Sequence, residues 1–271
     1  SSTTNSSTTN NLTYDLDGNL ISDGTWTYDW NGENCLVAAS NGLTVVTFDY
    51  DYLGRRFKKI TSTSTNTFLY NGWNLIQEMV NDDAGATTNF YFWGLDFSGT
   101  TMGAGGIGGL LSWTRLSDSK TFLYCYDANG NVGQLIDQSD GSVDAYYECG
   151  PFGEIVNCAG AEKDNNVYQF STKPLDAETG LYCYGFRYYD AKLGRWFSFD
   201  PTGELDSNNL YLFVHNNSVN KKDALGLSTL DIKIGARESS EVAGCDWQYG
   251  DAKKIGRNSD AIGVMAMDPV V

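Results

Sequence analysis

The sequence is short of histidine, proline and basic residues, and these shortages exclude several kinds of site. A single histidine, His215, occurs among 271 residues, so no site that needs two histidine ligands or a histidine pair can form within the chain. The chain has 18 lysines and arginines but 34 aspartates and glutamates, which gives a net charge of −16. Nucleic acids and anionic lipid surfaces are bound through positive charge, so the sequence predicts neither as a partner. We expect a structural role for His215, which lies in an aromatic run.

Recognisable cofactor, metal and targeting segments are also missing. The 6 cysteines contain no Cys-x-x-Cys spacing of a zinc ribbon or thioredoxin motif, although Cys149 and Cys158 flank a Pro-Phe-Gly turn and could pair in an exported protein. The glycine-rich run 101–111 lacks the Gly-Lys-Ser/Thr ending of a phosphate-binding loop, and we interpret it as a flexible insertion or a rim loop. No signal peptide is visible, and no run approaches the roughly 18 apolar residues of a membrane helix. We predict no cofactor, no metal site and no membrane span.

Aromatic residues and glycine are abundant instead, and they recur in one unit. Aromatics make up 14% of the chain, and 30 glycines stand against 4 prolines, which favours strands joined by tight turns. The unit is an aromatic residue, an Asp or Asn, and a turn containing Gly, as in residues 14–20, 26–34, 48–55, 68–75 and 126–132. Alternation places Trp26, Tyr28 and Trp30 on one face of a strand, with the flanking polar residues on the other. One hairpin cannot bury such a face, so neighbouring hairpins must pair side by side.

Ordered motifs follow this repeat region. In sequence they are YDANGNV at 126–132, GPFGE at 150–154, DAETGL at 176–181, RYYD at 187–190, GRW at 194–196, DP at 200–201, NNLY at 208–211, NNSVN at 216–220 and DALGL at 223–227. Together they resemble the Rhs repeat-associated core domain of Rhs polymorphic toxins, of the C components of insecticidal toxin complexes and of YD-repeat wall proteins. The resemblance covers residues 120–227 in detail and 10–120 more loosely.

The resemblance implies an all-β fold, in which YD-repeat hairpins form a spiralling sheet, part of a hollow shell, closed by a C-terminal plug. We expect a polar linker at 1–11, a shell segment at 12–119, the core at 120–227 and a variable C-terminal segment, cargo or tail, at 228–271. The polar start suggests a segment of a longer protein or a linker. Helix signals are sparse: single helical turns are expected at 33–39 and 221–225, and a short helix at 252–257.

Asp200 and Asp223 are the pair of residues with a mechanism. Two carboxyl groups held close cannot both ionise cheaply, so one can activate water while the other protonates the peptide. The resemblance implies that they form an aspartyl autoprotease, which cuts its own chain between Leu227 and Ser228. Gly226 would let the backbone bend close to the carboxyl groups.

Arginine and proline are absent from two positions where the family often has them. Phe199 stands directly before Asp200 where the family often has Arg, which would stabilise and orient an ionised aspartate. Arg195 could substitute, or it could stack on Trp196 without any chemistry. Ala224 replaces the usual Pro after the motif aspartate, which costs only rigidity.

The aspartates also have purely structural interpretations. Asp200 before proline could simply form a turn, and Asp223 could cap the turn that follows it. Asp190 could support the site, or it could form a structural ion pair with Arg187. The ordered motif set favours the catalytic interpretation of Asp200 and Asp223.

The sequence thus predicts the shell and self-cleaving core of a secreted or surface-exposed bacterial Rhs-type toxin, with its own C-terminal segment as cargo. Secretion-apparatus or toxin-complex shell components and a cognate immunity protein are the further partners expected. The rival from another class is a non-catalytic YD-repeat surface, adhesion or structural shell protein. A third alternative makes 228–271 itself a small toxin or ligand.

Overall fold

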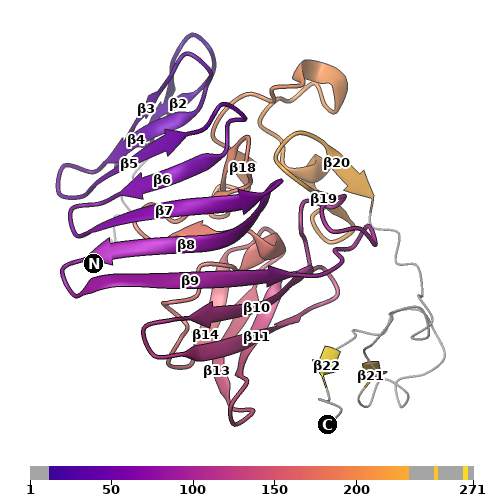
Figure 1. The fold of residues 1–271 in the computed structure, drawn as a ribbon. Coiled ribbons are helices and arrows are strands. Elements are labelled where there is room, and N and C mark those ends of the chain that lie inside the picture. The colour runs from indigo at the N-terminus through magenta and orange to yellow at the C-terminus, as the bar shows by residue number, and fades with distance from the viewer. Residues whose placement is uncertain (1–11, 232–246, 250–264, 268–271) are drawn as a thin grey trace, which may run out of the picture.

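The computed structural model describes residues 12–231, 247–249 and 265–267, and most of it is one long antiparallel sheet. Its 14 strands pair strictly in sequence order, as expected for a series of hairpins. Figure 1 shows the sheet curving from β2 and β3 at one end to β13 at the other. The strands are β1 Thr13–Tyr14, β2 Leu20–Ser22, β3 Thr27–Trp30, β4 Leu36–Ser40, β5 Val45–Tyr50, β6 Arg56–Ile60, β7 Ser64–Asn71, β8 Asn74–Asp82, β9 Gly85–Trp93, β10 Leu110–Arg115, β11 Lys120–Tyr126, β12 Val132–Asp137, β13 Val143–Cys149 and β14 Ile155–Ala159.

A recurring turn explains the repeat. Asp51 Oδ1 accepts the backbone N–H groups of Leu53 at 2.9 Å and Arg55 at 3.0 Å, two and four positions on. Gly54, three positions on, has φ of +75°, a conformation that glycine adopts without strain. The same two hydrogen bonds are formed by Asp15, Asn31 and Asp127. In these four units the Asp or Asn therefore supplies the acceptor that its turn needs. In the unit at 68–75, Asn71 instead pairs directly with Asn74 across the turn.

The predicted alternation is confirmed in the first strands. Trp26 and Tyr28 are buried, whereas Thr25, Thr27 and Asp29 are exposed. The buried face of β2–β5 shares one hydrophobic cluster with Leu181, Tyr188 and Phe197 from the C-terminal part of the chain. The sheet thus packs its aromatic face against the residues that follow it.

Short elements replace long strands after Ala159, and we call residues 160–227 the plug. It is built around a cluster of buried aromatics that includes Tyr189, Trp196 and Phe213. Arg56 of β6 pairs with buried Asp176 and so joins the sheet to the plug. From the plug onward, the described elements are η1 Phe170–Thr172, β15 Leu175–Asp176, β16 Leu181–Cys183, β17 Tyr188–Asp190, β18 Arg195–Trp196, η2 Gly203–Leu205, η3 Val214–Asn216, β19 Lys221–Asp223, β20 Thr229–Asp231, β21 Trp247–Tyr249 and β22 Met265–Met267.

The structure corrects two of the predicted helical turns. Residues 33–39 lead into strand β4, because Leu36 and its neighbours pair with β3. Residues 221–225 contribute to β19, which pairs with β20 in a hairpin. The helix expected at 252–257 lies outside the described residues.

The glycine-rich run 101–111 is not a flexible insertion. Ala104, Ile107 and Leu110 are buried. The carboxyl oxygen Oδ2 of buried Asp96 accepts the N–H groups of Ala104 at 2.7 Å and Gly106 at 3.1 Å, which gives the loop a fixed shape. We call residues 96–109 the glycine-rich loop.

The expected division at residue 120 does not coincide with an edge of the sheet. Strands β10 and β11 pair on either side of it, with Arg115 opposite Lys120. The change in architecture comes after Ala159, where the 14-stranded sheet ends. Within the described residues, no helix is long and apolar enough to cross a membrane.

Candidate active site

Asp200 and Asp223 both begin tight turns in the plug. Asp200 Oδ1 accepts the backbone N–H of Thr202 at 2.9 Å and its hydroxyl at 2.6 Å. Asp223 Oδ1 accepts the N–H groups two, three and four positions on, at 3.1, 2.6 and 3.1 Å. Each turn therefore occupies one carboxyl oxygen, and Oδ2 is the oxygen that meets groups from elsewhere in the fold.

Arg187 brings the two aspartates together. Its Nη2 lies 2.7 Å from Asp200 Oδ2 and 3.4 Å from Asp223 Oδ2. Because both distances start from one nitrogen atom, the two carboxyl groups must lie close to each other. The guanidinium group lies 4.2 Å from the ring centre of Trp196, and Nε donates to the carbonyl oxygen of Gly226. Only 2% of the Arg187 side chain is exposed, so this charge is buried and held on all sides.

Burial shapes the electrostatics of this pair. It raises the pKa of Asp223 above its ordinary value, although Arg187 and three backbone N–H groups act in the opposite direction. Burial likewise lowers the pKa of Arg187, against the pull of the two carboxylates. The arrangement therefore favours a state in which Asp223 can hold a proton while the shorter ion pair joins Arg187 to Asp200.

Each peptide group from 224 to 227 is hydrogen-bonded at both ends. Its N–H donates to Asp223 Oδ1 in each case. Its carbonyl oxygen accepts from a different group in each case: Lys173 Nζ for Ala224, the Phe186 N–H for Leu225 and Arg187 Nε for Gly226. A peptide group is planar, so bonds at both ends fix its orientation.

The bond between Leu227 and Ser228 lies in the turn of the hairpin formed by β19 and β20. The Leu227 carbonyl oxygen is 3.3 Å from the Thr202 hydroxyl, which also contacts Asp200. Ser228 is exposed, so water can reach this part of the turn. Gly226 has φ of +80°, and a Cβ added there would lie 3.1 Å from the Arg187 side chain. The Gly226 N–H lies 2.6 Å from Asp223 Oδ1, so the backbone here runs close to that carboxyl group.

Asp190 and Arg195, the predicted supporting residues, have other partners. Asp190 Oδ1 accepts the N–H groups two and three positions on, at 2.7 and 3.1 Å, and burial raises its pKa. The Arg195 guanidinium lies 4.4 Å from the ring centre of Tyr211 rather than on Trp196. Within residues 12–231, Arg195 forms no ion pair with Asp200 or Asp223, and Arg187 pairs with these two aspartates and not with Asp190. The predicted alternatives that paired Arg187 with Asp190 and Arg195 with Trp196 are therefore wrong.

Sequence reasoning missed the cation of the site. Phe199, which stands where the family often has Arg, packs its ring 4.9 Å from that of Tyr211. Arg187, 13 positions before Asp200, supplies the guanidinium instead. Thr202 and Lys173 were also missed. A hydroxyl two positions after Asp200 is a signal that could have identified Thr202, whereas nothing in the sequence points from Lys173 to residue 224.

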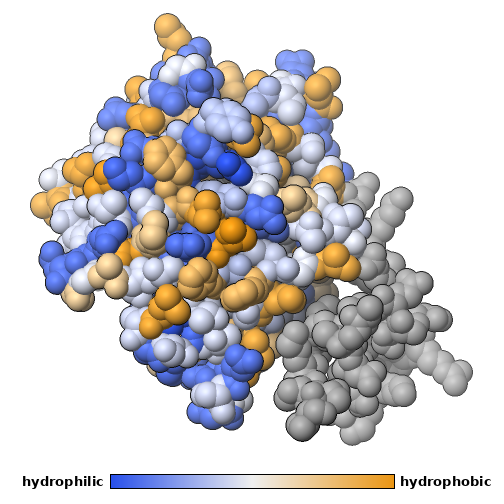
Figure 2. All heavy atoms as spheres, viewed as in Figure 1, coloured by the Kyte–Doolittle hydropathy of each residue, from blue (hydrophilic) through white to orange (hydrophobic). Residues whose placement is uncertain are grey.

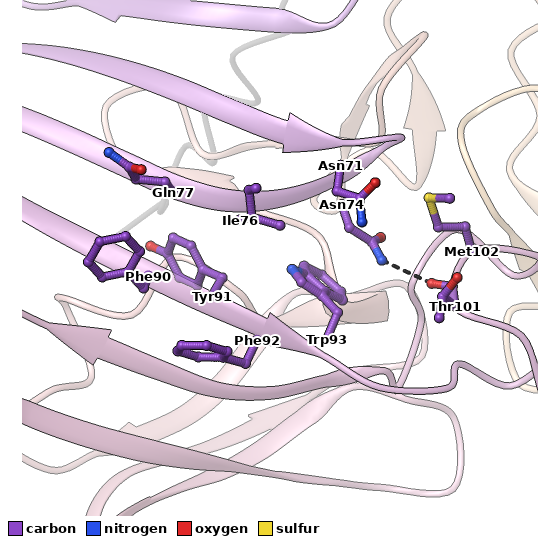
Figure 3. A pocket seen from close by; sticks show the side chains of 10 residues that line it. All are labelled: Asn71, Asn74, Ile76, Gln77, Phe90, Tyr91, Phe92, Trp93, Thr101 and Met102. Carbon is purple, nitrogen blue, oxygen red and sulfur yellow. Dashed lines mark hydrogen bonds between the residues drawn. The ribbon is translucent and has the colours of Figure 1, made fainter.

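Other candidate groups do not assemble a site. Cys149 and Cys158 are free thiols, and in the part of the chain that the structure describes no metal-binding cluster of His, Cys, Asp and Glu occurs. A cavity of about 380 Å³ lies beside β8 and β9, and the Asn74 amide at its edge donates to the Thr101 carbonyl at 2.9 Å. Figure 3 shows the side chains that line it. Its lining is aromatic, aliphatic and amide, without a carboxyl group for acid–base chemistry. The surface in Figure 2 mixes hydrophilic and hydrophobic residues.

Known proteins resemble this chain in sequence and in fold. The sequence model of the teneurin YD-shell family matches residues 4–219. The tRNA3(Ser)-specific nuclease WapA of Bacillus spizizenii is 30% identical over 223 residues, which are 79% of this chain and 9% of that protein. Toxin subunit YenC1 of Yersinia entomophaga is 42% identical over 97 residues, 36% of this chain and 9% of that subunit.

Solved structures share the fold. A crystal structure of TcdB2-TccC3-TEV matches with a TM-score of 0.65 at 24% identity, over 79% of this chain and 11% of that one. The Tc holotoxin pore of Photorhabdus luminescens matches with a TM-score of 0.64 at 22% identity, over 83% and 11%. The chain thus spans about a tenth of the length of these relatives. The family match and the shared sheet confirm the YD-repeat prediction: the chain belongs to the teneurin YD-shell family of Rhs-type YD-repeat proteins.

Proposed function

We propose that this chain is the C-terminal shell segment and self-cleaving core of an Rhs-type polymorphic toxin, which cuts its own backbone between Leu227 and Ser228. The observation that carries the proposal is the junction at Arg187, which holds Asp200 and Asp223 beside the turn that contains this bond. The nuclease WapA and the toxin subunit YenC1, both relatives of the chain, support the toxin assignment.

The two aspartates take different roles. Asp200, in the 2.7 Å ion pair with Arg187, is the ionised member and acts as general base on a water molecule. Asp223, whose protonated form is favoured by burial, acts as general acid. The Thr202 hydroxyl donates its one proton to Asp200 Oδ1 while Asp200 is ionised. Once Asp200 has taken a proton from the water, this hydroxyl turns to the Leu227 carbonyl oxygen, 3.3 Å away, and stabilises the negative charge that develops there.

The reaction consumes one water molecule. The water oxygen bonds to the Leu227 carbonyl carbon while its proton passes to Asp200. The carbon–nitrogen bond then breaks, and the Ser228 nitrogen takes the proton of Asp223 and leaves as an amine. Leu227 ends as a carboxylic acid, and transfer of a proton from Asp200 to Asp223 restores the starting state.

The products follow from where the bond lies. Residues 228–271 become a separate chain, the cargo segment, which stays associated with the shell until delivery. The carrier is a secreted or surface-exposed bacterial protein, with shell or secretion-apparatus components and an immunity protein as partners.

Intact mass under denaturing conditions tests the proposal, with wild type, Asp223→Asn and the sheet-turn variant Asp51→Asn compared. Wild type and Asp51→Asn are expected to give two species whose masses add to 29.8 kDa plus one water, with the break after Leu227. Asp223→Asn is expected to stay whole, because an amide cannot donate the acid proton. A single uncut species in wild type would overturn the proposal.

A purely architectural shell segment is the second candidate function. It is favoured by one observation: Arg187 and the turn N–H groups already satisfy both aspartates, as in a structural ion-pair network. Uncut wild type in the same measurement would select this function.

A further inference from the structure

We propose that Lys173 and the glycine-rich loop form a clamp that positions the cut-site turn for self-cleavage. The proposal rests on the proposed function, because a clamp of this kind matters for rate only where a bond is cut. Lys173 is a positioning residue in it: it touches the carbonyl of Ala224, next to Asp223, and not the carbonyl that reacts. The sequence motif that the function left unexplained, the glycine-rich loop, supplies the other half of the clamp.

Gly105 approaches the cut-site turn more closely than any other residue type would allow. A Cβ built on Gly105 would lie 2.0 Å from the Ala224 carbonyl oxygen and 2.6 Å from its carbon. Both are backbone atoms, so neither can move aside as a flexible side chain would. The loop backbone therefore forms one wall of the turn that follows Asp223.

Lys173 joins this wall to the turn. Its Nζ donates to the Gly105 carbonyl at 2.7 Å and to the Ala224 carbonyl at 2.6 Å. The side chain is only 4% exposed, and among residues 12–231 it forms no ion pair with a carboxylate. A buried ammonium group without a counter-ion is costly, so its two carbonyl partners and the Tyr184 ring, 5.5 Å away, hold it in one place.

The loop is itself rigid enough to act as a wall. Asp96 Oδ2 accepts the N–H groups on either side of Gly105, those of Ala104 and Gly106. The Gly108 N–H donates to the Thr172 hydroxyl at 2.8 Å, and Thr172 directly precedes Lys173. The loop and the lysine are thus held together by contacts that do not involve the cut-site turn.

The clamp acts on one particular peptide group. The Ala224 carbonyl, held by Lys173, and the Leu225 N–H, held by Asp223 Oδ1 at 3.1 Å, belong to the same planar unit. Release of the carbonyl end would let this peptide unit rotate. The Asp223 carboxyl group, which is hydrogen-bonded to its N–H, would then change its position relative to the bond to be cut. Misplacement of about 1 Å in such a site costs about 100-fold in rate.

The clamp also carries a pH signature. Burial lowers the pKa of Lys173 to about 8, and the titratable groups that face it, Asp223, Cys183 and Asp96, act in the opposite direction. Above this pH the ammonium becomes an amine, whose hydrogen bonds to the two carbonyls lack charge assistance. Wild-type cleavage is therefore expected to slow as the pH rises beyond 8.

A matched glycine pair tests the wall. Gly105→Ala and Gly141→Ala both place a side chain at positive φ, +63° and +74°, but nothing lies within 4 Å of a Cβ at Gly141. The full chain would be pulse-labelled in cell-free synthesis, and cleavage followed by mass. Gly105→Ala is expected to cut about 100-fold more slowly than Gly141→Ala, which keeps the wild-type rate to within about twofold. Urea unfolding of both variants verifies that each folds.

Lys173→Met tests the lysine without dependence on Gly105. At pH 7 it is expected to cut about 100-fold more slowly than wild type, and its residual rate should lack the decline above pH 8. A folded Lys173→Met or Gly105→Ala chain that cuts at the wild-type rate would overturn the clamp while leaving the autoprotease intact. An uncut wild type would overturn both.

Discussion

The turns of the sheet and the turns of the candidate site share one local structure. In the sheet, Asp51 accepts N–H groups two and four positions on, and Gly54, three positions on, has φ of +75°. At the site, Asp223 accepts N–H groups two, three and four positions on, and Gly226 has φ of +80°. Asp200 begins a third turn of the Asp-x-x-Gly type. The candidate catalytic turns are therefore built like the repeat turns.

The difference lies in the second carboxyl oxygen. Asp51 Oδ2 bonds to Arg55 in its own turn, and 21% of the Asp51 side chain is exposed. Asp223 Oδ2 faces Arg187, which lies 36 residues earlier in the chain, and only 3% of its side chain is exposed. Burial next to a distant charge, rather than the turn itself, shifts the protonation equilibrium of Asp223. The same sequence pattern thus forms a partly exposed hairpin turn in one place and a buried turn whose aspartate has a raised pKa in another.

A second contrast separates two buried aspartates that both face arginine. Asp176 pairs with Arg56 and Lys59 where the plug meets the sheet, and these charges hold its pKa below the ordinary value despite burial. Asp223 shares its arginine, and burial raises its pKa. Ionised Asp176 therefore stabilises the fold at neutral pH, whereas ionised Asp223 lowers the stability of the fold.

Asp176→Asn is expected to have the largest effect on stability. It leaves Arg56 buried beside a neutral amide, and loss of one partner of a buried pair costs about 3–5 kcal/mol in the free energy of unfolding. Asp223→Asn is expected to change the same quantity by about 1 kcal/mol or less, because the amide oxygen still accepts the turn N–H groups and Arg187 keeps Asp200. Urea unfolding at pH 7 measures both. Equal losses of unfolding free energy in the two variants would contradict the distinction between Asp176, which joins the plug to the sheet, and Asp223, which belongs to the candidate site.

The pH dependence of stability sharpens the same contrast. A lowered pKa in the folded state means that Asp176 contributes stability above its unfolded pKa of 3.8, which is lost as the pH falls through the folded value. The raised pKa of Asp223 has the opposite sign: its contribution is present below 3.8 and is lost as the pH rises through the folded value. The deficit of Asp176→Asn should therefore shrink in acid. The stability of Asp223→Asn relative to wild type should rise as the pH increases from acid to neutral. Urea unfolding midpoints of both variants and wild type, measured from pH 2.5 to 7, test these trends, and a trend of opposite sign in either variant would contradict the prediction.

The sheet could be predicted from the sequence because its physics is local. Each unit carries its own aromatic residues and a turn that contains glycine, so strand order follows from chain order. The predicted helical turn at 33–39 failed because weak local helix preference yields to pairing with β3. The helix preference of one segment does not report that the strand before it will pair with it.

The candidate site could be predicted only in part, because its partners are remote. The resemblance identified Asp200 and Asp223, and the structure brings both to Arg187. Arg195, closer in sequence, was the wrong choice of cation, since its strand places it on Tyr211. The contact of residue 105 with residue 224 joins segments more than 100 positions apart, and no periodicity in the sequence encodes it.

Asp51→Ala is expected to have the smallest effect on the rate of cleavage, and it tests whether sheet turns and site turns are independent. Loss of the carboxyl group removes the acceptor for two turn N–H groups, which costs about 1 kcal/mol in a partly exposed turn. The rate of cleavage should not change, because none of the partners of Asp51, which all lie within its own turn, touches Arg187. Asp223→Ala removes the same kind of acceptor at the site and should abolish cleavage. Slower cleavage in a folded Asp51→Ala chain would mean that a distant repeat turn helps to set the geometry of the plug, and that the two kinds of turn do not act separately.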